Sequence, residues 1–171
     1  NIVDRPKSKE VILKIVENIA KGHQLSLIDM ATGTGKTRVA AGLIELLIRK
    51  KKVSNVLFVV DRDSLRSQGI DDLNEFLNGV VKFSSSSSKN GIFVESIQKF
   101  LAKSKDKDKH KVFENLDSGF FDLIIFDECH RSLYNEGRKF FDYFNCKKVG
   151  LSATPKGCLL YTSPSPRDGL L

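Results

Sequence analysis

The sequence predicts an α/β fold with a doubly wound parallel sheet in a single domain, and three observations predict it. Short apolar runs of strand length alternate with segments whose apolar residues recur at helical spacing. Several of these runs end in polar or glycine-rich residues, as parallel strands do at the edge of a sheet where ligands bind. The length of 171 residues suits one domain. The alternation of strands and helices implies right-handed crossovers, with helices on both faces of the sheet.

Five segments are predicted strands, because they are apolar enough to be buried on both faces of a sheet. They cover residues 25–28, 56–60, 92–94, 121–130 and 148–155. Predicted helices cover residues 1–22, 38–50, 61–77 and 136–144, and a further one ends near Ala102. The five serines at 84–88 and the charged run at 103–111 are expected to form loops.

The chain is basic, and its sequence shows neither the cysteine spacing of a zinc site nor a membrane-spanning segment. Its 28 lysines and arginines against 21 acids give a net charge of +7, which favours a polyanionic partner but also fits an ordinary basic domain. Cys129, Cys146 and Cys158 lack the spacing of a zinc site, so a reduced, cytoplasmic setting is expected. No apolar run approaches the ~18 residues of a membrane span.

The stretch DMATGTGKT follows the first predicted strand and precedes a predicted helix. Glycines let such a loop curl around a phosphate, so that backbone N–H groups at the start of the helix face it. Lys36 is expected to reach the outer phosphates of a nucleotide, and the Thr37 hydroxyl to hold a magnesium ion. Met30 replaces the first glycine of G-x-x-x-x-G-K-[ST], and a glycine-rich turn that binds nothing is the alternative. The predicted nucleotide-binding residues are Thr32, Gly33, Thr34, Gly35, Lys36 and Thr37.

Two acids follow the apolar run of the fourth predicted strand. Asp127 is expected to hold Mg²⁺ together with Thr37, and Glu128 to act as the general base that takes a proton from the attacking water. Helix-capping surface acids are the alternative interpretation. His130, together with the SAT sequence after the fifth predicted strand, is expected to relay hydrogen bonds from these acids.

ATGTGKT, DECH, SAT followed by Pro155, and DRDSLRSQ resemble motifs I, II, III and Ia of the superfamily 2 helicases and translocases. Residues 2–156 are similar to the first RecA-like domain of that family, which is a P-loop NTPase fold. VVDRDSLRSQ, ESIQKF and DECHRS most resemble the motor of type I restriction enzyme R subunits and their relatives in the type III restriction and DEAH-like group.

The resemblance implies an ATP hydrolase that uses Mg²⁺ and moves on DNA, with methylase and specificity subunits of a restriction complex as further partners. It implies that Lys36, Asp127 and Glu128 are catalytic. The residues that couple hydrolysis to nucleic acid would be His130, Ser152 and Thr154. Those near the DNA backbone would be Arg62, Ser96 and Gln98, where ordinary loop and cap roles are the alternative.

The sequence departs from the family pattern in two places. Lys7 and Ser8 follow Arg5 and Pro6 where an adenine-contacting Arg-Pro-x-Gln element is common, so adenine selectivity is less secure. The second RecA-like domain, with its arginine finger, is absent. The chain alone is therefore expected to bind nucleotide weakly and not to translocate.

Residues 158–171 are expected to be foreign to the gene. CLLYTSPSPRD back-translates to a transposon-type sequencing-library adapter, so residues 1–157 are taken as the ATP-binding domain and 158–171 as adapter read-through. A native proline-rich linker is the alternative. Continuous genomic reads across Cys158 would contradict the adapter interpretation.

Three other functions compete with a DNA motor. A generic DEAD/DEAH-box helicase acting on DNA or RNA would carry the same motifs. A P-loop kinase or GTPase would need an acceptor-substrate pocket or a guanine-reading motif, and the sequence shows neither. A non-catalytic nucleic-acid-binding module with a vestigial loop would not need the intact Lys36, Asp127 and Glu128.

Overall fold

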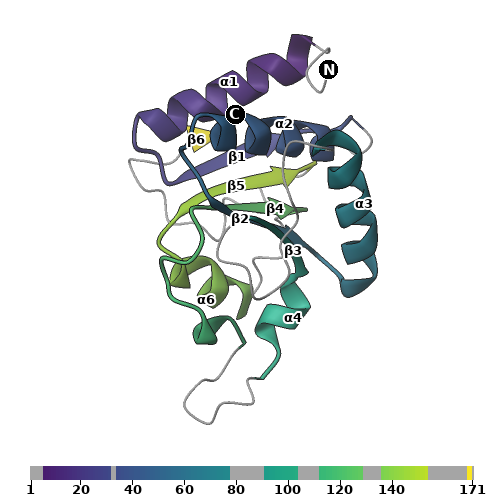
Figure 1. Ribbon diagram of the computed structural model, residues 1–171, viewed down its shortest axis with the longest axis vertical. Helices are drawn as coiled ribbons and strands as arrows, with labels where there is room; N and C mark the ends of the chain where they lie inside the picture. The colour runs from purple at the N-terminus through teal and green to yellow at the C-terminus, as the bar shows by residue number, and fades with distance from the viewer. Residues whose placement is uncertain are drawn as a thin grey trace.

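One parallel β-sheet runs through the middle of the domain, with helices on both of its faces (Figure 1). The structure is a computed structural model that describes residues 6–31, 34–77, 91–103, 112–128, 136–153 and 169–170. The strands lie in the order β3-β2-β4-β5-β1-β6, and neighbouring strands are parallel throughout the described sheet. The predicted doubly wound α/β fold is confirmed.

All five predicted strands are present. Their bounds are β1 (Leu25–Asp29), β2 (Asn55–Val60), β3 (Gly91–Ser96), β4 (Leu123–Asp127) and β5 (Lys147–Ser152). The strand predicted to reach residue 130 ends at Asp127, because the backbone of Glu128 is left-handed with a φ of 50°. The fifth strand likewise ends at Ser152, before the predicted residue 155.

A sixth strand, β6 (Gly169–Leu170), pairs with β1 at the edge of the sheet. It lies in the segment predicted to be adapter read-through. Only two residues of that segment are described, and its origin stays a prediction.

The helices also follow the predicted pattern, with two differences. Their bounds are α1 (Pro6–Ala20), α2 (Lys36–Arg49), α3 (Arg66–Leu77), α4 (Ile97–Leu101) and α6 (Glu136–Tyr143). The helix predicted for 61–77 begins as a separate 3₁₀ turn, η1 (Asp63–Leu65), and a second turn, η2 (Val112–Asn115), was not predicted. Across the described helices, none is long and apolar enough to cross a membrane. The serine run and residues 104–111 lie outside the described residues.

Two hydrophobic cores form on opposite faces of the sheet. Val56, Phe58 and Val60 of β2 pack into the core under α1, α2 and α3, whereas Leu57 and Val59 pack into the core on the other face. That second core is rich in phenylalanine from β4, η2, α4 and α6. The continuous apolar run of β2 follows from this burial on both sides.

The strand order brings three carboxyl ends to one rim. In the parallel register Asp29 of β1 lies opposite Ser152 of β5, and Asp127 of β4 lies opposite Leu151. The Met30 backbone N–H donates to the Ser152 carbonyl at 3.0 Å, which fixes the chain leaving β1 beside the end of β5. The glycine-rich loop and the acids after β4 therefore meet at the same edge of the sheet.

Candidate active site

Gly35 sets the start of α2, the helix that follows the glycine-rich loop. Its φ of 93° lies in the left-handed region that glycine adopts at little cost, and its carbonyl accepts the Val39 N–H at 3.0 Å. Just before it, the Thr34 hydroxyl donates to the Ala31 carbonyl at 2.5 Å. Thr32 and Gly33 lie outside the described residues. The described part of the loop therefore ends in a backbone turn that directs Lys36 and Thr37 to the rim.

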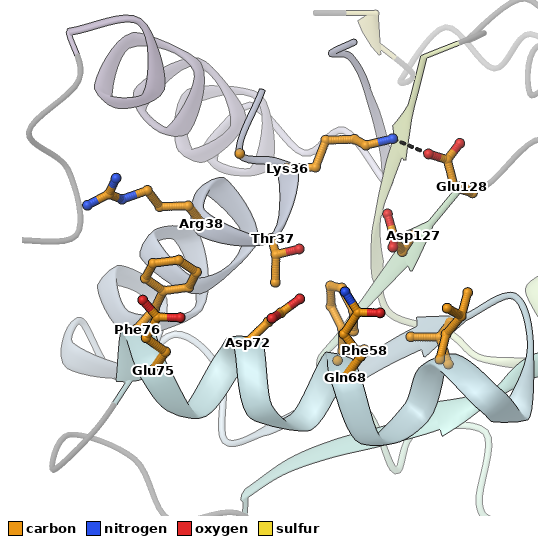
Figure 2. Close-up of a pocket in the computed structure, with 14 residues that line it drawn as sticks. Lys36, Thr37, Arg38, Phe58, Gln68, Asp72, Glu75, Phe76, Asp127 and Glu128 are labelled. Atoms are coloured by element: carbon orange, nitrogen blue, oxygen red, sulfur yellow. Dashed lines mark hydrogen bonds and ion pairs between the residues drawn. The ribbon is translucent and has the colours of Figure 1, made fainter. Parts of the chain in front are cut away.

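The Lys36 ammonium is ion-paired with the Glu128 carboxylate (Figure 2). Lys36 is the first residue of α2 and is only 8% exposed, while Glu128 directly follows β4. A left-handed backbone at a residue with a side chain costs of order 1–2 kcal/mol, so the turn at Glu128 is strained. Such strain is typical of functional sites, and here it aims the carboxylate at the lysine.

Asp127 lies beside this pair at the end of β4. Burial raises the pKa of its carboxyl above the ordinary value; the nearby Lys36 charge lowers that pKa, and the Glu128 charge raises it. The Asp127 carboxylate is therefore held where its negative charge is poorly solvated. A cation bound next to it would relieve this cost.

A pocket of about 510 Å³ opens next to these residues. The start of α2 and the turn after β4 form one wall of the pocket, and α3 forms the opposite wall (Figure 2). Its lining includes Gly35, Lys36, Thr37, Asp127 and Glu128. Four chemical groups that the sequence singled out, an amine, a hydroxyl and two carboxylates, thus share one pocket.

The donor set of the pocket fits magnesium. Mg²⁺ prefers oxygen ligands and takes only one or two carboxylates, the rest of its shell being water and phosphate. Thr37 offers a hydroxyl and Asp127 a carboxylate in the same pocket (Figure 2). Within the described ranges no group of three His, Cys, Asp or Glu side chains could hold a metal by itself.

The residues predicted to couple hydrolysis to nucleic acid are only partly described. Ser152 is buried at the carboxyl end of β5, the strand that lies between β4 and β1 in the sheet. His130 and Thr154 lie outside the described residues.

The three residues predicted near the DNA backbone have different environments. The Arg62 side chain is 67% exposed and lies 3.5 Å from the Asp61 carboxylate, and Gln98 is exposed on α4. Ser96, in contrast, is fully buried: its hydroxyl donates to Asp63 at 3.0 Å and accepts the N–H of Lys99, which caps α4. In this conformation the Ser96 hydroxyl serves the fold and does not reach solvent.

The wall that α3 contributes to the pocket is not predicted by the sequence. Gln68, Asp72, Glu75 and Phe76 line the pocket opposite the phosphate loop, and the Arg38 guanidinium lies 5.5 Å from the centre of the Phe76 ring. The helical period predicted α3 itself. Of these four residues only Gln68 lies in a quoted motif, DRDSLRSQ, and that motif does not indicate which polar residues of α3 face the pocket.

The comparison with protein families decides the classification. Residues 1–157 match the model of the family described as "Type III restriction enzyme, res subunit". The chain belongs to this family. Among curated proteins it is 34% identical over 152 residues to the type I restriction enzyme EcoAI endonuclease subunit of Escherichia coli, covering 86% of this chain and 19% of that protein. It is 30% identical over 179 residues to the EcoKI endonuclease subunit of Escherichia coli K12, covering 86% of this chain and 15% of that protein.

The chain spans a fifth or less of these two relatives. Solved structures agree on the fold. The SWI2/SNF2 ATPase core of Sulfolobus solfataricus in complex with dsDNA superposes with a TM-score of 0.71 at 15% identity, covering 89% of this chain and 32% of that one. The type ISP restriction-modification enzyme LlaGI gives a TM-score of 0.65 at 20% identity, covering 88% and 17%. The domain therefore has the RecA-like helicase fold.

Proposed function

We propose that this chain is the ATP-binding half of a DNA-dependent ATPase motor, which hydrolyses ATP to drive movement on duplex DNA within a type I restriction endonuclease R subunit. The observation that carries the proposal is the meeting of Lys36, Thr37, Asp127 and Glu128 in one pocket at the carboxyl rim of the sheet. The relatives of this family, which are restriction endonuclease subunits, support the wider context.

The phosphates of ATP are held at the start of α2. Backbone N–H groups and the positive end of the helix dipole attract them, and the Lys36 ammonium contacts the outermost phosphate. Thr37 and Asp127 would hold Mg²⁺, and a bound ion would neutralise charge on the phosphates of the nucleotide. Losing the Lys36 contact costs roughly 1.5–3 kcal/mol, the range for a charge-assisted hydrogen bond.

Glu128 acts after the nucleotide binds. Because Lys36 and Glu128 are paired with each other, the lysine changes partner from the carboxylate to the phosphate as ATP enters. The Glu128 carboxylate then accepts a proton from the water whose oxygen attacks the γ-phosphorus, and the bond from that phosphorus to the bridging oxygen breaks so that ADP leaves. Through this change of partner, Glu128 becomes available as the general base only when nucleotide has bound.

Arg62 and Gln98 contact the DNA backbone, where basic and polar groups position phosphates without reading sequence. His130, Ser152 and Thr154 transmit the state of the ATP site toward the DNA. The arginine finger is supplied by a second RecA-like domain of the full-length protein. This chain alone binds nucleotide weakly and does not translocate.

The test uses the full-length protein that contains this chain. ATP turnover is measured alone, with duplex DNA and with an RNA of the same sequence. Strong stimulation by duplex DNA supports the proposal, whereas turnover that ignores DNA would refute a DNA motor. Preferential stimulation by RNA would favour a general helicase.

The neighbourhood of the gene tests the restriction context separately. Methylase and specificity genes next to it are expected, because their products are the proposed partner subunits. A neighbourhood without them would place the motor outside a restriction system.

A further inference from the structure

Helix α3 packs close against the sheet, and this brings the turn after Gly69 to the pocket that Lys36, Thr37, Asp127 and Glu128 line. Leu73 and Leu77 are fully buried, and a Cβ placed on Gly69 would lie 3.3 Å from a methyl group of Val60. A Cβ that close would force the Val60 side chain to shift by a few tenths of an ångström, so glycine permits the close approach. The position of α3 beside the rim is therefore fixed by packing.

Asp72, one turn after Gly69, is the acid of α3 that faces the metal ligands. It lines the pocket together with Thr37 and Asp127, and Figure 2 shows its carboxylate pointing up toward Thr37. Within the described part of the chain, no hydrogen bond or ion pair engages the Asp72 carboxylate.

Such a carboxylate is unfavourable in the empty pocket and useful in an occupied one. Two carboxylates that face one pocket repel each other, and a cation bound between them attracts both and offsets that repulsion. Within the described residues, Asp72, Asp127 and Glu128 do not form a three-residue metal group. Mg²⁺ in nucleotide sites keeps several water molecules, and outer carboxylates commonly accept hydrogen bonds from such waters.

We propose that Asp72 is a positioning residue of the magnesium site, whose carboxylate accepts hydrogen bonds from water bound to the ion held by Thr37 and Asp127. The inference rests on the proposed function, since it assigns a further residue to the same site. It makes α3 a third element of the ATP site, besides the glycine-rich loop and the turn after β4.

The test measures the magnesium requirement of nucleotide binding by the 171-residue chain. A fluorescent ATP analogue is held at fixed concentration, Mg²⁺ is titrated, and binding is followed by fluorescence anisotropy. Asp72→Asn is expected to raise the Mg²⁺ concentration at half-saturation about tenfold, the lower end of the effect of outer-shell partners. Asp71→Asn is the matched control, because this neighbouring acid is exposed and does not line the pocket.

Two further arms separate positioning from folding. With EDTA in place of Mg²⁺, Asp72→Asn is expected to bind the analogue as well as the wild type, which also reports that the variant is folded. Asp72→Glu keeps the charge and is expected to restore most of the Mg²⁺ affinity. Equal Mg²⁺ midpoints for Asp72→Asn and Asp71→Asn, or an equal loss of binding with and without Mg²⁺, would overturn the role of Asp72.

The result that would overturn the proposed function differs from the result that would overturn only the role of Asp72. A wild-type chain that binds no ATP analogue at any Mg²⁺ concentration would overturn the ATP site, and Asp72's role with it. A wild type that binds in a Mg²⁺-dependent way while Asp72→Asn matches it would overturn only the role of Asp72.

Discussion

The ammonium group of Lys36 and the carboxylate of Glu128 form an ion pair across 92 positions of sequence, joining the start of α2 to the turn after β4. Both groups belong to the proposed reaction, the first as a phosphate ligand and the second as a general base. In the structure the two groups are paired with each other. Under the proposed function, the pair would compete with ATP for Lys36, while the Glu128 side chain is 26% exposed.

Glu128→Gln should bind ATP more tightly than the wild type and stop its turnover. The neutral amide releases Lys36 for the phosphate but cannot take a proton from water. Losing a competing charge-assisted contact of about 1.5–3 kcal/mol predicts a dissociation constant lower by about tenfold or more. Calorimetric titration of ATP into the chain measures the affinity, and turnover is measured in the full-length protein.

The matched control is Glu17→Gln, which makes the same change at an exposed acid paired with Lys21 on α1. It should leave both affinity and turnover unchanged. Unchanged turnover in Glu128→Gln would remove Glu128 from its role as the base.

Gly35→Ala should lose nucleotide binding together with some stability. The φ of 93° forces alanine into the left-handed region at a cost of about 1–2 kcal/mol, although the nearest atom to the added methyl group would lie 3.8 Å away. Gly22→Ala is the control, because Gly22 has a φ of 91° at the end of α1, with nothing within 4 Å of an added Cβ. Both variants should be destabilised similarly in urea, and only Gly35→Ala should bind ATP poorly. Equal binding by the two would argue against a phosphate at this turn.

Ser96→Ala should destabilise the domain by about 1–2 kcal/mol. It removes the N-cap of α4 and leaves the Asp63 carboxylate without its buried hydrogen-bond donor. Urea unfolding of the chain measures the loss. Gln98→Ala, two residues along on the exposed surface, should leave stability unchanged and weaken DNA binding by the full-length protein. A Ser96→Ala variant of wild-type stability would contradict the buried cap.

Asp127→Asn should make the nucleotide-free chain more stable at neutral pH. Burial raises the pKa of the Asp127 carboxyl above 3.8, so the folded chain holds this proton more tightly than the unfolded chain. The stability that the protonated carboxyl contributes is complete below pH 3.8 and is lost as the pH rises through the raised pKa. The amide keeps that stability at all pH values.

Urea unfolding at several pH values between 4 and 7, without nucleotide, should show the advantage of Asp127→Asn growing with pH. Asp71→Asn at an exposed acid serves as the reference for removing one negative charge. An Asp127→Asn variant that is less stable at pH 7, or a difference that does not change with pH, would contradict the assigned cost of burial.

The strands and the phosphate loop were predictable because their signals are local. A run such as residues 56–60 must be apolar to be buried on both faces, and a glycine at position 35 is needed where the backbone turns left-handed before a helix. Parallel strands share one carboxyl edge, so the meeting of Lys36 with Asp127 and Glu128 also followed from the sequence.

Other features depend on contacts that the sequence does not display. Lys36 pairs with Glu128 because the fold brings these two side chains together, and the sequence alone does not indicate which nearby charge the lysine pairs with. The burial of Ser96 follows from the packing of η1 on β3, and the face that α3 turns to the pocket follows from Gly69 against the sheet. The turn η2 has only four residues, too few to show a period.

Calorimetric titration of ATP into the 171-residue chain at saturating Mg²⁺, for the wild type and for Lys36→Ala, tests the ATP site most directly. The wild type should bind one ATP with measurable affinity, and Lys36→Ala, folded as judged by circular dichroism, should lose at least tenfold in affinity, as expected for a contact of about 1.5–3 kcal/mol. ATP binding of equal strength by both chains would contradict the site.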